Sequence, residues 1–363
     1  RMQKRRACVL ADFCILHSSF CLQLMVRLKD IALRAGVSVM TVSKVMRDAA
    51  DISAPTKARV RKLAEQMGYV PDTAAQGLRS RTTKLFGLVI AASTNPVFAR
   101  VLMAIEEQAH QLGCEVILSH SLNQPEREEA VIRRMLSRRV DGLFLSPVYR
   151  LDPTAPIYQE LARRQTPTVL LGHRAPFCSQ FLNVETDDLL ASYSITKHLL
   201  ELGHKRIAHF TGPAVAPSSQ ERLEGYRRAL REFQIEVDDR LIFNAGSTME
   251  EGGNAALQML NESTQATAVQ AVNDLVAIGA ATVFLGQGLR IPQDLSLVGF
   301  GNVLLSEHFR VPLTTIRQPK SRLGVAAMEL MLKLLRGERP GPVRLPAELI
   351  VRQSTAPPAL NAQ

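Results

Sequence analysis

The stretch RLKDIALRAGVSVMTVSKVMR, Arg27 to Arg47, decides the N-terminal fold. Apolar residues recur at helical spacing on both sides of a central turn, and these are Ile31, Ala32, Ala35, Val42, Val45 and Met46. Gly36 can adopt the left-handed conformation that ends a helix. Ser38 can cap the next helix by accepting a hydrogen bond from the Thr41 amide. The pattern predicts a helix-turn-helix whose second helix reads base edges.

A third helix is predicted directly after this unit, from Pro55 to Met67, with Ser53 as its N-cap. Its apolar positions lie on one face and can close a small core with the first two helices. The segment GYVPDTAAQGLRSRTT, Gly68 to Thr83, follows. It is too polar to be buried, and it carries Leu78 with nothing local to pack against.

Two motifs in this region point to a known family. The run AGVSxxTVSxV (Ala35 to Val45) and the run GYVPxxxAxxL (Gly68 to Leu78) together resemble the lactose-repressor (LacI/GalR) family of bacterial transcription regulators. The resemblance implies an N-terminal all-α helix-turn-helix head over residues 25–69 and a hinge over 70–83. It also implies a sensor over 84–363 that binds an effector and forms a dimer.

The net charge is confined to the start of the chain. Residues 25–84 hold twelve Lys and Arg against five Asp and Glu, whereas residues 85–363 hold 28 of each. A basic head gains affinity for duplex DNA by releasing counterions from the phosphates. The alternative is a solvated basic surface without a partner.

Residues 1–24 form a leader that we expect to lie outside the fold, with Met25 as the natural start. Its basic beginning and apolar run superficially suit a signal peptide or a membrane anchor, but polar residues interrupt the run. The five cysteines show no metal spacing, so we expect a reduced cytoplasm, no metal and no cofactor.

From Leu85 onward, apolar strand segments alternate with helical ones, and the series starts again near Asp188. Such alternation predicts parallel sheets with helices on both faces. By resemblance, the sensor is an α/β periplasmic-binding-protein-like unit of two doubly wound parallel-sheet lobes joined by three crossings. We assign lobe 1 to residues 84–186 and 317–352, and lobe 2 to residues 187–316.

The residues expected to contact DNA lie on the second helix and in the hinge. By resemblance they are Val39, Met40, Thr41, Ser43, Lys44 and Leu78. Val39 and Met40 suit thymine methyl groups, unless they pack the head's own core, and Lys44 suits guanine or a phosphate. Leu78 matches the family's leucine that wedges into the minor groove. Because one head offers few base contacts, we expect a homodimer on a pseudo-palindromic site.

The residues expected to contact the effector are placed mainly by resemblance. They are Asn95, Phe98, His173, Arg174, Arg222, Asn273 and Asp274. Arg222 has the alternative of a surface helix arginine, and Asp274 that of a helix cap. Gly172, Ser247 and Gly301 stand where relatives carry acidic or aromatic residues. We therefore expect a cleft poor in acceptors that suits an anionic effector, such as a sugar acid or a phosphorylated metabolite.

Two other classes of protein are weighed against a regulator. An enzyme on a doubly wound sheet would be expected to show a phosphate-binding or nucleophile motif, and the sequence has no GxGxxG, GxxxxGK[ST] or GxSxG. A solute-binding protein would have no use for residues 26–80. We expect an effector-controlled repressor, with no enzymatic activity and no membrane partner.

Overall fold

The computed structural model describes residues 26–70 and 82–359. The chain divides into two compact units, Arg1–Arg79 and Ser80–Gln363, and each is described by itself. Within the described residues no helix is long and apolar enough to span a bilayer. Leu78 and most of the expected hinge lie outside the described residues.

The first unit contains the predicted helix-turn-helix. Its helices are α2 Leu28–Ala35, α3 Val39–Met46 and α4 Ala54–Gln66. Gly36 ends α2 with φ of 64°, and the Ser38 hydroxyl accepts from the Thr41 amide at 3.0 Å, as predicted. Arg27 cannot cap α2, but the Asp30 carboxylate accepts from the Arg27 amide at 2.8 Å and satisfies one helix-terminal group.

The three helices share one small apolar core. It contains Ile31, Ala32, Ala35, Val42, Val45, Val60 and Ala64, all buried. Ser53 precedes α4 as predicted, yet its side chain makes no capping bond and pairs with the Thr56 hydroxyl at 2.9 Å instead.

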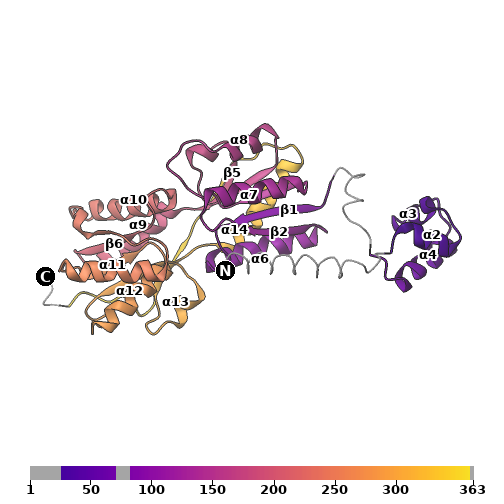
Figure 1. Ribbon diagram of the computed structural model, residues 1–363. Helices are drawn as coiled ribbons and strands as arrows, with labels where there is room; N and C mark the ends of the chain where they lie inside the picture. Colours follow the sequence, from indigo (N-terminus) through magenta and orange to yellow (C-terminus); the bar gives the residue numbers. More distant parts are fainter. Residues whose placement is uncertain (1–25, 71–81, 360–363) are drawn as a thin grey trace, which may run out of the picture. The chain divides into compact units, whose positions relative to one another are not determined.

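The second unit consists of two α/β lobes that lie side by side (Figure 1). The sheet of lobe 1 has the order β11-β5-β4-β3-β1-β2, and the sheet of lobe 2 has the order β12-β10-β9-β8-β6-β7. All pairings are parallel except that between β10 and β12. The predicted architecture of two parallel-sheet lobes is therefore confirmed, with one antiparallel edge strand in lobe 2.

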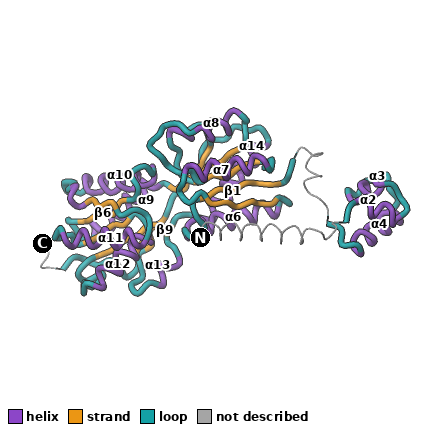
Figure 2. The backbone as a smooth tube through the Cα atoms, in the orientation of Figure 1, coloured by secondary structure: helices purple, strands orange, loops and turns teal. Residues whose placement is uncertain are grey.

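The strands of lobe 1 are β1 Leu85–Ile90, β2 Glu115–His120, β3 Gly142–Leu145, β4 Thr168–Leu171, β5 Leu182–Thr186 and β11 Val343–Leu345. Its helices are α6 Pro96–Gln111, α7 Pro125–Ser137, α8 Pro156–Arg163 and α14 Lys320–Leu335. Helices α6 and α14 pack on one face of the sheet, and α7 and α8 on the other. Figure 2 shows α6 and α7 on opposite sides of the strands.

The strands of lobe 2 are β6 Ile207–Thr211, β7 Ile242–Asn244, β8 Ala268–Ala271, β9 Ser296–Gly301, β10 Thr314–Arg317 and β12 Glu348–Ile350. Its helices are α9 Asp188–Glu201, α10 Pro217–Glu232, α11 Met249–Asn261, α12 Asp274–Gly286 and α13 Leu304–His308. Helices α9 and α10 cover one face of the sheet, and α11 and α12 cover the other.

The chain passes between the lobes three times, after β5, after β10 and after β11. The assignment of residues 348–352 to lobe 1 was wrong, because β12 pairs with β10 in the sheet of lobe 2. Residues 346 and 347 are the last crossing, and the segment beyond them packs on lobe 2, where the Ser354 hydroxyl donates to the Leu297 carbonyl.

Candidate functional site

The start of α3 presents apolar side chains to solvent. Val39 is 47% exposed and Met40 is 57% exposed, whereas Val42 and Val45 on the same helix are fully buried. The core of the head is therefore complete without Val39 and Met40, which excludes the alternative that they pack inside it. Two exposed apolar side chains at the N-terminal end of a second helix suit contact with base edges.

The polar residues of α3 have different surroundings. Thr41 takes part in the cap with Ser38, and the Ser43 carbonyl accepts from Arg47 at 3.1 Å. Lys44 forms an ion pair with Asp51, in which both side chains are partly exposed. Lys44 is thus held at the surface by a weak contact that a phosphate or a base can replace.

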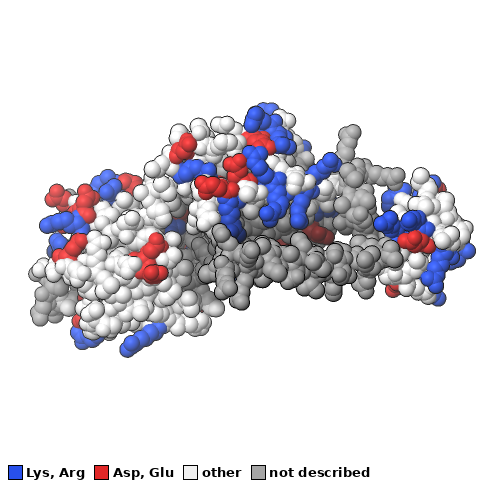
Figure 3. All heavy atoms as spheres, viewed as in Figure 1, with Lys and Arg blue, Asp and Glu red and all other residues white. Residues whose placement is uncertain are grey.

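The head is basic over its described part. Residues 26–70 hold nine Lys and Arg and four Asp and Glu, and the face drawn in Figure 3 shows Lys and Arg side chains spread over α2, α3 and α4. An excess of positive charge around an exposed reading helix attracts the phosphates on either side of a groove.

A cavity of about 250 Å³ lies between the two lobes of the second unit. Its wall comes from the carboxyl ends of strands in both sheets, which is where open α/β sheets bind ligands. Its lining residues include Asn95, Phe98, Ser146, Tyr149, His173, Glu185, Asp188, Ser218, Arg222, Asn273, Asp274, Phe300 and Gln318. Six of the seven residues expected at the effector site line this cavity.

Arg174 is the exception. It is exposed and does not line the cavity. The turn after β4 directs His173 inward, where it is 6% exposed, and leaves its neighbour on the outer surface. Arg174 is therefore withdrawn from the expected effector contacts.

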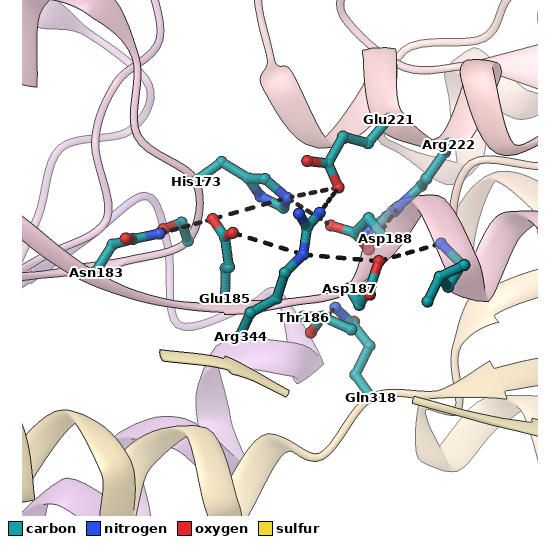
Figure 4. Close-up of polar contacts among 12 residues, drawn as sticks. His173, Asn183, Glu185, Thr186, Asp187, Asp188, Glu221, Arg222, Gln318 and Arg344 are labelled. Atoms are coloured by element: carbon teal, nitrogen blue, oxygen red, sulfur yellow. Dashed lines mark hydrogen bonds and ion pairs between the residues drawn. The ribbon is translucent and has the colours of Figure 1, made fainter. Parts of the chain in front are cut away.

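Arg222 is largely buried and contacts three partners within lobe 2. Its Nε and Nη2 donate to the same Asp188 carboxylate oxygen at 3.1 and 2.9 Å, and Nη1 donates to the Val272 carbonyl at 2.5 Å. Its guanidinium lies 3.7 Å from the ring centroid of Phe300. The alternative of a surface arginine is excluded. The neighbouring carboxylate balances the charge of Arg222, as the contacts drawn in Figure 4 show.

Asp274 connects separate segments of lobe 2 by hydrogen bonds. Its carboxylate accepts from the Val303 amide at 2.8 Å and from the hydroxyls of Ser306 and Thr315 at 2.6 and 2.5 Å. Burial raises the pKa of Asp274, and these hydrogen bonds oppose that rise. Asp274 therefore holds the cavity wall in place and has little capacity left for a ligand.

Two asparagines cap helices at the cavity edge. Asn95 accepts from the Val97 amide at 3.1 Å at the start of α6, and Asn273 accepts from the Val276 amide at 2.8 Å at the start of α12. Asn273 also donates to the Ser247 carbonyl at 3.1 Å. Each asparagine retains amide hydrogens that a ligand in the cavity can use.

Two carboxylates in the wall were missed in the sequence. Glu185 comes from the end of β5 and Asp188 from the start of α9, so both lie at the first crossing. Acidic residues at the carboxyl end of a buried strand and just beyond it were the signal that could have marked them. The expectation of a cleft that lacks acceptors was wrong, because these two residues supply them.

Gly172, Ser247 and Gly301, the positions where relatives carry acidic or aromatic residues, contribute less to the cavity wall than expected. Only Gly172 lines the cavity, whereas Ser247 and Gly301 do not. Gly172 has φ of 124° and Gly301 has φ of 136°. A residue with a side chain would be strained in this backbone conformation. At Gly172 a Cβ atom would also lie 3.2 Å from the Tyr149 hydroxyl.

Comparisons with known proteins cover both units. Residues 27–72 match the model of bacterial regulatory proteins of the lacI family, and residues 196–355 match that of the periplasmic binding protein-like domain. The transcriptional regulator DegA of Bacillus subtilis is 31% identical over 90% of this chain and 97% of its own. The repressor CytR of Escherichia coli K12 is 33% identical over 90% and 96%. The chain belongs to the LacI family.

Solved structures of the LacI family agree with this assignment. The lac repressor dimer bound to operator and the anti-inducer ONPF has a TM-score of 0.81, with 30% identity over 92% of this chain and 99% of that one. A complex of the regulator CelR with cellobiose has a TM-score of 0.69 and 28% identity over 91% and 99%. These relatives are named regulators, so the chain is a DNA-binding transcriptional regulator with an effector-binding unit.

Proposed function

We propose that this LacI-family chain is a repressor that binds a pseudo-palindromic operator as a homodimer in the cytoplasm. The observation that carries the proposal is the exposure of Val39 and Met40 at the start of a capped second helix, on a head with excess positive charge. Two heads are needed because one short helix reaches too few base pairs for a specific site. Its relatives are named regulators, and we propose no catalytic role for the cavity.

In vitro selection of random duplexes with the full chain tests this function. We expect enriched sites with two-fold symmetry, bound by two copies of the chain. The double variant Val39→Ser, Met40→Ser should lose preference for those sites and keep its affinity for random DNA. Enrichment of no sequence, or the same sequence preference in the double variant, would contradict the proposal.

We further propose that the effector is uncharged, contrary to the expectation from the sequence. Asp188 neutralises Arg222, and Glu185 adds a second carboxylate to the wall. An anion would have to displace Asp188 from Arg222 or lie beside Glu185, and both arrangements are costly in a partly buried site. Phe98 and Phe300 supply an apolar side, so the wall suits a molecule with one apolar face and one edge of hydroxyl or amide groups.

The volume of the cavity limits the size of this molecule. At about 250 Å³ it lies just below the usual range of roughly 300–1,000 Å³ for ligand sites. Calorimetry with matched pairs, each a neutral compound and its acid or phosphate, decides the charge. Tighter binding of the acid or phosphate in several pairs would overturn the proposal and restore the original expectation.

A further inference from the structure

One carboxylate of lobe 2 lies between two cations of lobe 1. Glu221 on α10 has its Oε2 atom 3.2 Å from Nε2 of His173, which follows β4. The same oxygen accepts a hydrogen bond from Nη2 of Arg344 on β11. Figure 4 shows the two lobe 1 side chains meeting Glu221 from the opposite lobe. This set of Glu221, His173 and Arg344 is called the latch below.

Further carboxylates surround the latch. Nε2 of His173 lies 3.5 Å from Asp188 and 4.0 Å from Glu185, and Nε of Arg344 lies 3.6 Å from Asp187 and 3.7 Å from Glu185. Arg222 also belongs to this group of charges, because it pairs with Asp188. The two permanent cations, Arg222 and Arg344, therefore face four carboxylates, which are Glu185, Asp187, Asp188 and Glu221. A proton on His173 offsets one of the two excess negative charges.

The contacts of the latch depend on the distance between the lobes. Arg344 lies on β11 and His173 in the turn after β4, both in lobe 1, whereas Glu221 belongs to a helix packed on the sheet of lobe 2. The His173 side chain is 7% exposed and the Glu221 side chain 25% exposed, so the pair between them is shielded from water. The Arg344 side chain is 42% exposed, so its pair with Glu221 lies at the solvent-facing side of the latch. Shielded pairs are stronger than surface pairs, and they are lost when the partners separate.

We propose that the latch stabilises the closed arrangement of the lobes, defined as the one in which Glu221 contacts His173 and Arg344, without any ligand, and that its strength depends on the protonation of His173. The equilibrium between open and closed lobes is then a built-in property of this chain, on which an effector acts. The proposal concerns the unliganded protein, so its test is independent of the function proposed above.

The direction of the pH dependence follows from the surroundings of His173. Burial alone would lower its pKa, but the contact with Glu221 and the charges of Asp188 and Glu185 outweigh burial and raise the pKa above 6.5. Tyr149 donates to the main-chain carbonyl of His173 and leaves its imidazole unaffected. The contribution of His173 is therefore complete below about pH 6.5 and is lost as the pH rises through the higher pKa of the folded state.

Hydrogen exchange on the unliganded full chain tests the latch. The segments to follow are 172–175 after β4 and 217–221 at the start of α10, which carry its two sides. Glu221→Gln removes the charge and keeps the shape. Glu224→Gln is the matched control, because Glu224 lies on the same helix in an exposed pair with Arg231. Variants are compared with the parent chain at the same pH, which cancels the intrinsic pH dependence of exchange.

We expect Glu221→Gln to speed exchange in both segments at least threefold at pH 6, and Glu224→Gln to leave them unchanged. Arg344→Gln, made from the opposite lobe, should reproduce the effect of Glu221→Gln. His173→Gln should speed exchange at pH 6 and match the parent chain at pH 9. The proposal is overturned if Glu221→Gln behaves as Glu224→Gln does, or if His173→Gln has the same effect at both pH values, including none.

Discussion

Replacement of Arg222 by alanine removes the cation that balances a buried carboxylate. The variant loses two hydrogen bonds to Asp188, one to the Val272 carbonyl and the stacking on Phe300. Asp188 is 2% exposed, so it cannot recover these interactions from water. We therefore expect Arg222→Ala to destabilise the second unit before any effect on a ligand is considered.

The magnitude follows from the loss of one partner of a buried pair. Such a loss costs about 3–5 kcal/mol, because the other charge remains buried and uncompensated. Burial already raises the pKa of Asp188, and Arg222 and His173 oppose that rise. Without Arg222 the carboxyl group takes up a proton more readily. The free energy lost in the variant should then be smaller at pH 5 than at pH 8.

Calorimetric unfolding of the full chain measures the loss, with Arg227→Ala as the matched control. Arg227 lies on the same helix in an exposed pair with Asp239, so its replacement should change stability little. The double variant Arg222→Ala, Asp188→Asn removes the unpaired charge and should recover more than about 1.5 kcal/mol. An equal effect of Arg222→Ala and Arg227→Ala, or no recovery in the double variant, would refute the reasoning.

Four shorter predictions concern the two units. Lys44→Ala should weaken operator binding in gel shifts at low salt, and unchanged affinity would remove Lys44 from the interface. Leu78, which lies outside the described residues, is expected to wedge into the minor groove. Leu78→Ala should lower affinity for operator far more than for random DNA, because the wedging side chain contributes only where the duplex bends. Equal losses of affinity on both DNAs would contradict this. Ile31→Ala should cost the head about 2–5 kcal/mol and abolish DNA binding, while the main calorimetric transition of the second unit stays unchanged. Burial, with the charges of two nearby arginines, lowers the pKa of His209 to about 3. Between pH 7 and 5 the unfolded chain therefore binds a proton that the fold excludes, which costs about 2 kcal/mol and should disappear in His209→Leu.

The sequence by itself determined the head and the plan of the sensor. The spacing of Ile31, Ala35, Val42 and Val45 and the chemistry of Gly36 are local, so the helices and their turn could be predicted from neighbouring residues alone. Strand and helix alternation likewise predicted two parallel sheets. The six effector residues that line the cavity were expected mainly from the resemblance to the family, and several of them, such as His173 and Asn273, follow strands and so lie at the carboxyl edge of a sheet.

Only the tertiary structure decided which charges meet. Arg222 pairs with a residue 34 positions away, and Arg344 with one 123 positions away. Residues 85–363 hold equal numbers of acidic and basic side chains, so composition favours no sign of charge in the cavity. Which charges balance each other depends on which strand ends face one another across the lobes and on how deeply each group is buried. Local pattern contains neither quantity, and for that reason the sequence suggested an anionic effector where we propose an uncharged one.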